Sequence, residues 1–156
     1  MSGYSGTPLA KKLGIGAGCR LFLRAAPANY DALVAPLPEG VTVVSRIGPD
    51  TDVIHLFATR RADLERALDS ALRAMRADAS VWVSWPKKSS GLTSDITEDT
   101  VREVALPLKL VDIKVCAVDE TWSGLKLVVR KEVRAAWPQR AARTTHASRA
   151  AGGRRP

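Results

Sequence analysis

The chain has 156 residues, enough for one hydrophobic core of ordinary size but too few for two. Its composition, with 46% hydrophobic and 26% charged residues, excludes a fibrous or wholly disordered protein. The formal net charge of +8 does not by itself indicate a nucleic-acid-binding domain, because the five arginines of residues 135–156, where no acid stands, supply +5 of it.

The cysteines and the apolar runs of the sequence indicate where in the cell the protein is expected. Cys19 and Cys116 each lie in an apolar run, which predicts buried, reduced thiols rather than a disulfide framework. Residues 1–13 lack the apolar stretch of a signal peptide, and no run reaches the about 18 apolar residues of a membrane span. We therefore expect a soluble, cytoplasmic protein without a membrane partner.

The first elements are short. Thr7 and Pro8 have the residue types of an N-cap and a first helical position, and they predict a helix over residues 9–13. An apolar strand is predicted over residues 19–24. A second short helix is predicted over residues 28–37.

The middle of the chain carries the strongest patterns. Residues 41–47 are rich in β-branched residues and predict a strand. Residues 52–58 are apolar on both faces except for His55, a pattern typical of a central parallel strand covered by helices. Thr59 then caps a predicted helix that begins at Arg60, because apolar residues follow at helical spacing: Leu64, Ala67, Leu68, Ala71, Leu72 and Met75.

Another strand and helix follow. Residues 80–85 predict a strand that Pro86 ends. Asp95 stands three residues before Glu98, the spacing of a capping box, so a helix is expected to begin there. Pro107 should end or kink this helix one turn before it.

The last two strands, residues 111–119 and 125–130, are joined by residues 120–124, a connection short enough for an antiparallel hairpin. Strands alternating with helices predict an α/β fold, a three-layer Rossmann-like sandwich with a mostly parallel sheet and a C-terminal antiparallel hairpin. We assign residues 1–133 to this single domain and residues 134–156 to a disordered basic tail, since the tail has too few apolar residues to offset its ordering entropy.

The element order over residues 19–130 resembles the S-adenosylmethionine-dependent methyltransferases. The resemblance implies a glycine-rich loop after the first strand, but residues 24–29 hold no glycine, and Pro27 has no N–H to offer a ligand. It also implies an acid after the second strand, where this chain has Ser45 and Arg46. Both departures argue against that cofactor, and no cofactor is predicted.

Specific stretches look like a bacterial family filed as domain of unknown function 3052. They are residues 3–9 (GYSGTPL), 13–15 (LGI), 85–88 (WPKK) and 119–125 (DETWSGL). The similarity covers nearly everything up to Lys131 and implies kinship, but no catalytic residue.

The default ligand site of an open parallel sheet lies at the carboxyl ends of its strands. Cationic loops and helix N-termini at that edge favour an anionic small molecule, although the same charges could be solvated loop residues. The ligand-binding candidates are Asn29, Arg60, Arg61, Trp85, Lys87, Lys88, Ser89 and Trp122.

Catalytic and metal chemistry find little support. His55 has no acid or cysteine at relay or ligand spacing, and His146 lies in the tail, so neither a metal site nor a catalytic residue is predicted. Asp119 and Glu120 are adjacent and should point to opposite faces of a strand end. We therefore predict a non-catalytic binding or interaction module. The alternatives are a degenerate methyltransferase-like enzyme and a nucleic-acid accessory protein that acts weakly and non-specifically through the tail.

Overall fold

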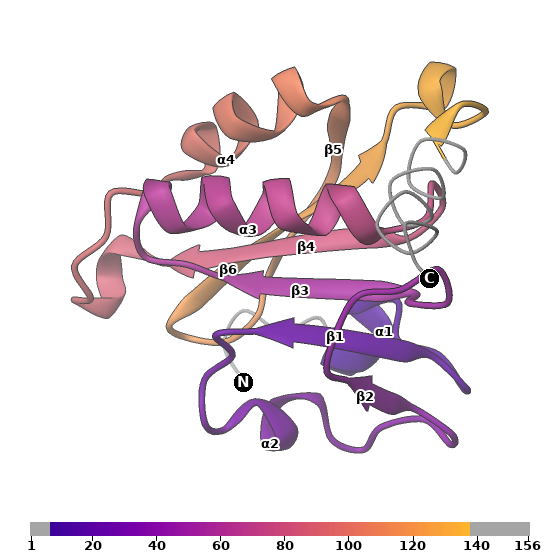
Figure 1. Ribbon diagram of the computed structural model, residues 1–156. Helices are drawn as coiled ribbons and strands as arrows, with labels where there is room; N and C mark the ends of the chain where they lie inside the picture. The colour runs from indigo at the N-terminus through magenta and orange to yellow at the C-terminus, as the bar shows by residue number, and fades with distance from the viewer. Residues whose placement is uncertain (1–6, 138–156) are drawn as a thin grey trace.

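The computed structural model describes residues 7–137, which form a six-stranded sheet with helices on both faces (Figure 1). The strands are β1 (Arg20–Arg24), β2 (Thr42–Val44), β3 (Val53–Phe57), β4 (Ser80–Pro86), β5 (Leu110–Ala117) and β6 (Trp122–Val129). The α-helices are α1 (Leu9–Leu13), α2 (Tyr30–Val34), α3 (Arg61–Ala74) and α4 (Glu98–Ala105). Short 3-10 turns are η1 (Lys88–Ser90), η2 (Leu106–Leu108) and η3 (Lys131–Val133).

The strand order is β2-β1-β3-β4-β6-β5. The first four strands of this order are parallel, and Ile54 of β3 lies beside Val81 of β4. Strand β6 runs antiparallel to both β4 and β5. The structure thus confirms the predicted α/β sheet with its C-terminal antiparallel hairpin.

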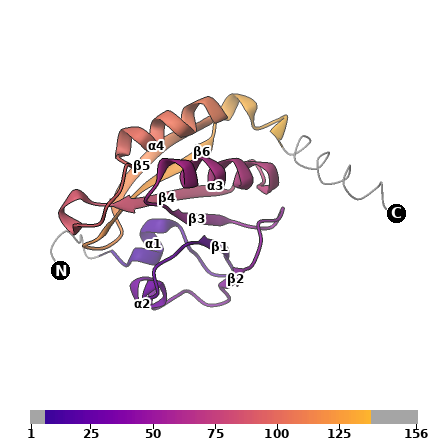
Figure 2. The same ribbon diagram turned by 60° about the vertical axis from the view of Figure 1, so that its left-hand side comes forward.

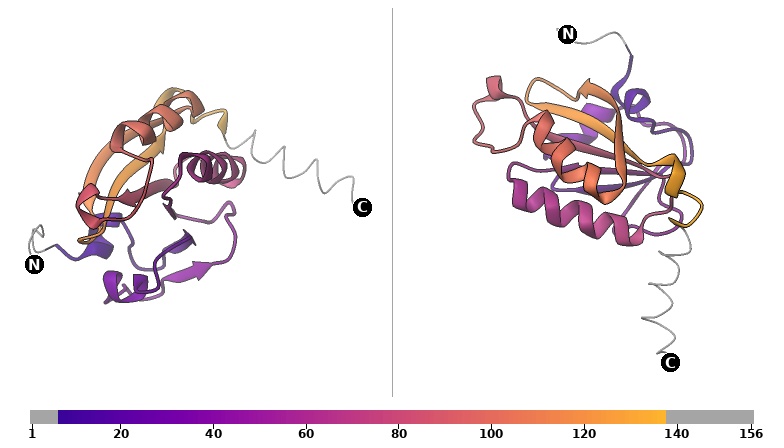
Figure 3. Two further views of the ribbon diagram at one scale, coloured as in Figure 1. Left: turned by 90° about the vertical axis from the view of Figure 1, so that its left-hand side faces the viewer. Right: turned by 90° about the horizontal axis from the view of Figure 1, so that it is seen from above.

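The molecule has three layers because its central strands bury side chains on both faces. Figure 2 shows α3 and α4 on one side of the sheet and α1 and α2 on the other, and Figure 3 shows α3 and α4 side by side over the sheet. In β3, Ile54 and Leu56 pack towards α3 and α4, whereas Val53 and Phe57 pack towards the shorter helices. All five residues of β3 are buried, which is the burial that its apolar pattern predicts.

Several helix ends differ from the prediction by one or more residues. The N-cap residues of α1 and α3 are Pro8 and Arg60, not Thr7 and Thr59, and neither helix has a side-chain cap from its own N-cap residue. Helix α2 covers only Tyr30–Val34, because the residue before a proline is driven into extended backbone and Ala35 precedes one.

The predicted capping box of α4 is wrong in its residues. Thr97 is the N-cap, and its hydroxyl and that of Thr100 each accept a hydrogen bond from the other residue's backbone N–H. Asp95 instead lies across from α3, where its carboxylate accepts from the backbone N–H of Arg61 at 2.6 Å. An acid distant in sequence therefore provides the cap that Arg60 cannot.

Replacing Asp95 with alanine is expected to lower the free energy of unfolding by about 1 kcal/mol, the usual value of an N-cap side chain. Asp95→Asn keeps an acceptor oxygen and should lose less. Urea denaturation measures the difference, with the exposed Glu120 of the β5–β6 turn, replaced by alanine, as the matched control. A loss for Asp95→Ala no larger than the control would show that the contact contributes nothing.

The hairpin turn lies earlier than the sequence indicates, because β5 ends at Ala117 and β6 already begins at Trp122. Trp122 and Gly124, which were assigned to the turn, belong to β6, where they pair with Pro86 and Ser84 of β4. Gly124 has a packing role, because a Cβ there would lie 3.3 Å from Trp82 Cε3 in the core. Gly124 suggests a turn in the sequence, but in the structure it lies inside β6, where the close approach of Trp82 favours a residue without a side chain.

The folded region extends past residue 133. Arg134 donates to the carbonyl of Val129 at 3.0 Å, and Trp137 is buried, with its indole N–H donating to the carbonyl of Met75 at 3.1 Å. The rest of the predicted tail, residues 138–156, lies outside the described residues. No helix within residues 7–137 combines the length and the apolar character needed to cross a membrane.

Candidate functional site at the β1–β3 crevice

The chain leaves β1 and β3 towards opposite faces of the sheet. Strand β1 leads through α2 to β2 on one side, and β3 leads through α3 to β4 on the other. Between the carboxyl ends of β1 and β3 the strand order therefore reverses, which opens a crevice at the place where doubly wound sheets bind ligands.

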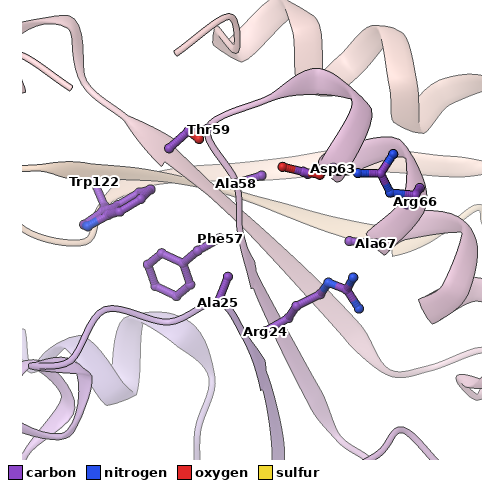
Figure 4. Close-up of a pocket in the computed structure, with 9 residues that line it drawn as sticks. All are labelled: Arg24, Ala25, Phe57, Ala58, Thr59, Asp63, Arg66, Ala67 and Trp122. Atoms are coloured by element: carbon purple, nitrogen blue, oxygen red, sulfur yellow. Dashed lines mark hydrogen bonds and ion pairs between the residues drawn. The ribbon is translucent and has the colours of Figure 1, made fainter. Parts of the chain in front are cut away.

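A pocket of about 300 Å³ occupies this crevice. This volume is at the lower end of the range for small-molecule sites. The lining residues come from the ends of β1 and β3, the first turns of α3 and the start of β6: Arg24, Ala25, Phe57, Ala58, Thr59, Asp63, Arg66, Ala67 and Trp122 (Figure 4).

One end of the pocket is aromatic. The rings of Phe57 and Trp122 meet edge to face, with centroids 5.0 Å apart. Trp122 reaches this position because β6 pairs antiparallel with β4 and therefore begins beside the carboxyl ends of β4 and β3. Aromatic walls of this kind supply apolar contact area for a flat ring.

The other end of the pocket is charged. Arg24 and Arg66 lie on the side away from Trp122, and Asp63 lies between the aromatic end and Arg66 (Figure 4). Asp63 accepts a hydrogen bond from Arg66. Two guanidinium groups against one carboxylate give the pocket a net positive charge, which favours an anionic group.

The loop after β1 carries a backbone conformation that is unusual for its residue. Ala25 has φ of 58°, in the left-handed region, and it lines the pocket. A side chain with a Cβ pays a free-energy cost in this region that glycine does not. Strain of this kind is often found at binding sites.

Ala25→Gly is expected to raise the free energy of unfolding by about 0.5 kcal/mol, because relief of the left-handed strain exceeds the extra entropy that glycine gives the unfolded chain. The neighbouring Ala26, which has an ordinary φ, serves as the control, and its replacement with glycine should lower stability. Thermal and urea unfolding of both variants test this. Equal losses in the two would contradict the assignment of strain to Ala25.

A chain of buried polar side chains lies behind the aromatic wall. His55 Nδ1 is 2.9 Å from the Tyr30 hydroxyl, and His55 Nε2 is 2.8 Å from Ser84 Oγ. His55 also stacks on Phe57, with ring centroids 4.3 Å apart. Burial lowers the pKa of His55 to about 3 and raises the pKa of Tyr30, so both side chains are neutral at neutral pH.

The predicted ligand residues are dispersed. Trp122 alone among them lines the pocket. Asn29 is exposed at the N-cap of α2, and Arg60 is exposed at the N-cap of α3. Arg61 is bound to Glu65 at 3.1 Å and to Glu103 at 2.8 Å.

The remaining candidates lie beyond β4. Trp85 packs in the core on the α3 and α4 side of the sheet. Lys87 donates its backbone N–H to Thr121 at 2.8 Å, and Lys88 and Ser89 are exposed in η1. None of these residues contributes to the pocket between β1 and β3.

Sequence reasoning missed four polar or aromatic lining residues: Arg24, Phe57, Asp63 and Arg66. Arg24 and Phe57 are the last residues of their strands, so the carboxyl-end rule could have identified them if the strand ends had been counted as part of the site. Asp63 and Arg66 stand three residues apart in α3, which predicts that they share a helix face but not which face it is.

Comparisons with known proteins identify the fold. No family model and no curated protein matches the chain. A S-adenosylmethionine-dependent methyltransferase from Aquifex aeolicus matches 78% of this chain and 88% of its own, at 12% identity and a TM-score of 0.53. A putative type 11 methyltransferase from Sulfolobus solfataricus matches 79% and 90%, at 13% identity and a TM-score of 0.52. A protein of the NADB-Rossmann superfamily from Streptococcus agalactiae matches 83% and 71%, at 9% identity and a TM-score of 0.50.

The chain has a Rossmann-like methyltransferase fold. Identities this low establish the fold alone. Within that fold, residues 24–29 occupy the position expected for the glycine-rich loop, and Ala25 adopts the left-handed conformation without being a glycine. Ser45 and Arg46 directly follow β2, where the resemblance implies an acid. These residues do not fit the expected binding pattern for S-adenosylmethionine.

Proposed function

We propose that the protein is a non-catalytic binding module for a small anionic molecule that carries a flat ring, and that the pocket between β1 and β3 is its binding site. The observation that carries this proposal is one pocket with Trp122 and Phe57 at one end and Arg24 and Arg66 at the other. The aromatic end would pack against the ring, and the guanidinium groups would bind the anionic group.

The lining residues also support binding rather than catalysis. Asp63 is the acid of the pocket, and its carboxylate already accepts a hydrogen bond from Arg66. His55 and Ser84 are fully buried behind Phe57, so neither can reach a ligand. We also propose that the chain is related to the family filed as domain of unknown function 3052. That relationship implies no catalytic residue.

Isothermal titration calorimetry of the full chain with adenosine monophosphate and with inorganic phosphate tests the proposal. Arg66→Ala should weaken nucleotide binding about 10-fold or more, since a charge-assisted hydrogen bond contributes about 1.5–3 kcal/mol. Arg73→Ala is the matched control, because Arg73 lies on the same helix, bound to Asp69, outside the pocket.

Trp122→Leu separates the two ends of the pocket. It should weaken binding of adenosine monophosphate but leave binding of inorganic phosphate unchanged, because phosphate has no ring to pack against the indole. Nucleotide binding that is absent, or that Arg66→Ala and Arg73→Ala weaken equally, would refute the proposed site.

The second candidate function is that of a degenerate methyltransferase-like enzyme. The fold that this chain shares with its structural neighbours favours this candidate. The crevice between β1 and β3 is retained, but residues 24–29 and the end of β2 lack the groups that the resemblance implies. Titration with S-adenosylmethionine decides between the two. Micromolar binding of that compound, without binding of adenosine monophosphate, would replace the first proposal with the second.

A further inference from the structure

The hydrophobic cluster between the sheet and α2 contains three polar side chains that form one hydrogen-bonded chain. Tyr30 begins α2, His55 lies in the middle of β3, and Ser84 lies in β4, where it pairs in register with Phe57. His55 and Ser84 are fully buried and Tyr30 is 3% exposed, so water cannot replace their contacts. The residues around them are apolar: Leu13, Leu21, Val34, Val53, Phe57 and Trp82.

The hydrogen count of this chain shows that it is not optimised for stability. The two hydroxyl groups and one neutral imidazole carry three polar hydrogens, but the chain has only two junctions. In either tautomer of His55, one hydroxyl hydrogen has no acceptor within residues 7–137. Each polar atom of the chain has a partner, but the surplus hydrogen is buried without an acceptor, and apolar side chains of similar shape would avoid that cost.

The same chain is connected to the pocket by ring contacts. His55 stacks on Phe57 at an interplanar angle of 27°, and Tyr30 meets Phe57 edge to face with centroids 5.8 Å apart. Phe57 in turn contacts Trp122. The hydrogen bond between Tyr30 and His55 therefore joins the start of α2 to the ring that stacks on Phe57. Helix α2 directly follows the loop that contains Ala25.

We propose that the Tyr30–His55–Ser84 chain positions Phe57 and the loop after β1, and thereby sets the affinity of the pocket for its ligand. This inference rests on the proposed function of the pocket and assigns positioning residues to it. The hydrogen bonds give the rings of Tyr30 and His55, which both pack against Phe57, one orientation that apolar packing alone would leave less defined. The neutral imidazole is suited to this role because it donates from one nitrogen and accepts at the other.

Two variants that remove one hydroxyl each, Tyr30→Phe and Ser84→Ala, test the inference. Each should weaken binding of adenosine monophosphate about 10-fold in calorimetry, while the protein stays folded by circular dichroism. Trp82→Phe is the matched control: it removes another buried hydrogen bond of the same cluster, from the indole to the carbonyl of Leu13, but leaves the chain intact. It should lower the thermal midpoint without changing the affinity.

A readout that needs no ligand separates this inference from the proposed function. Fluorine NMR of protein labelled with 5-fluorotryptophan, with the Trp122 resonance assigned through Trp122→Phe, reports the position of the Phe57 ring that Trp122 contacts. Tyr30→Phe and Ser84→Ala should shift or broaden the Trp122 resonance and leave that of Trp137 unchanged. If the wild-type protein binds no nucleotide, the proposed function fails, but a shifted resonance still supports the positioning role. An unchanged Trp122 resonance in both variants would overturn the inference.

Discussion

Acidification from neutral pH to about pH 4.5 is expected to lower the free energy of unfolding by about 2–3 kcal/mol through His55 alone. Burial lowers the pKa of this imidazole to about 3 in the folded protein, from 6.5 for the exposed group. Above 6.5 the ring is neutral in both states, so it causes no pH dependence there. Between 6.5 and 3 only the unfolded chain takes up the proton, and stability falls as the pH falls.

Urea denaturation at a series of pH values measures this loss. The matched variant is His55→Gln, whose amide can donate and accept but does not titrate, and its stability should stay nearly constant until the carboxylates protonate. The slope of the wild-type protein between about pH 6 and pH 4.5 should approach about 1.4 kcal/mol per pH unit. Identical slopes in the two proteins would mean that His55 is not buried in its neutral form.

Trp82→Ala is expected to be the most destabilising single substitution considered, with a loss of about 3–5 kcal/mol. The indole is fully buried on the α1 side of the sheet, and its N–H donates to the carbonyl of Leu13 at 2.9 Å. Removal of the ring leaves a cavity and an unpaired carbonyl, and it detaches α1 from β4. Chemical denaturation monitored by circular dichroism measures the loss.

A double-mutant cycle with Gly124 tests the packing more sharply. Gly124→Ala alone should cost about 1–3 kcal/mol, because the new Cβ would meet Trp82 Cε3 at 3.3 Å and the buried indole would have to shift to accommodate it. In the Trp82→Leu background the same change should cost less, since the contact with the indole is gone and the close contact with Val118, also at 3.3 Å, remains. Additive losses in the cycle would contradict the close approach of these two residues.

The contacts at the N-terminus of α3 also support the proposed position of the anionic group. A free helix N-terminus beside Arg60 and Arg61 would be the expected anion site. In the structure the Asp95 carboxylate already accepts from the Arg61 N–H, and Glu65 and Glu103 bind the Arg61 side chain. An incoming anion is therefore expected at Arg24 and Arg66 instead.

Local patterns in the sequence were sufficient to predict several strands and helices of the fold. An apolar run on both faces predicted that β3 is central and parallel, helical spacing predicted α3, and a short connection predicted the antiparallel hairpin. A ligand site at the carboxyl ends of the parallel strands stays a prediction, and the pocket between β1 and β3 lies at that edge. These predictions were possible because the periodicity of apolar side chains in a helix or strand can be read from residues close together along the chain.

The contacts between side chains from distant parts of the sequence could not be predicted from local patterns. Asp95 caps a helix that begins 34 residues earlier, and His55 finds partners 25 and 29 residues away in Tyr30 and Ser84. The position of Trp122 beside Phe57 depends on the order in which β4, β6 and β5 pair. Such contacts are fixed by strand order and register, and no local pattern encodes these because the pairing partner lies elsewhere in the chain.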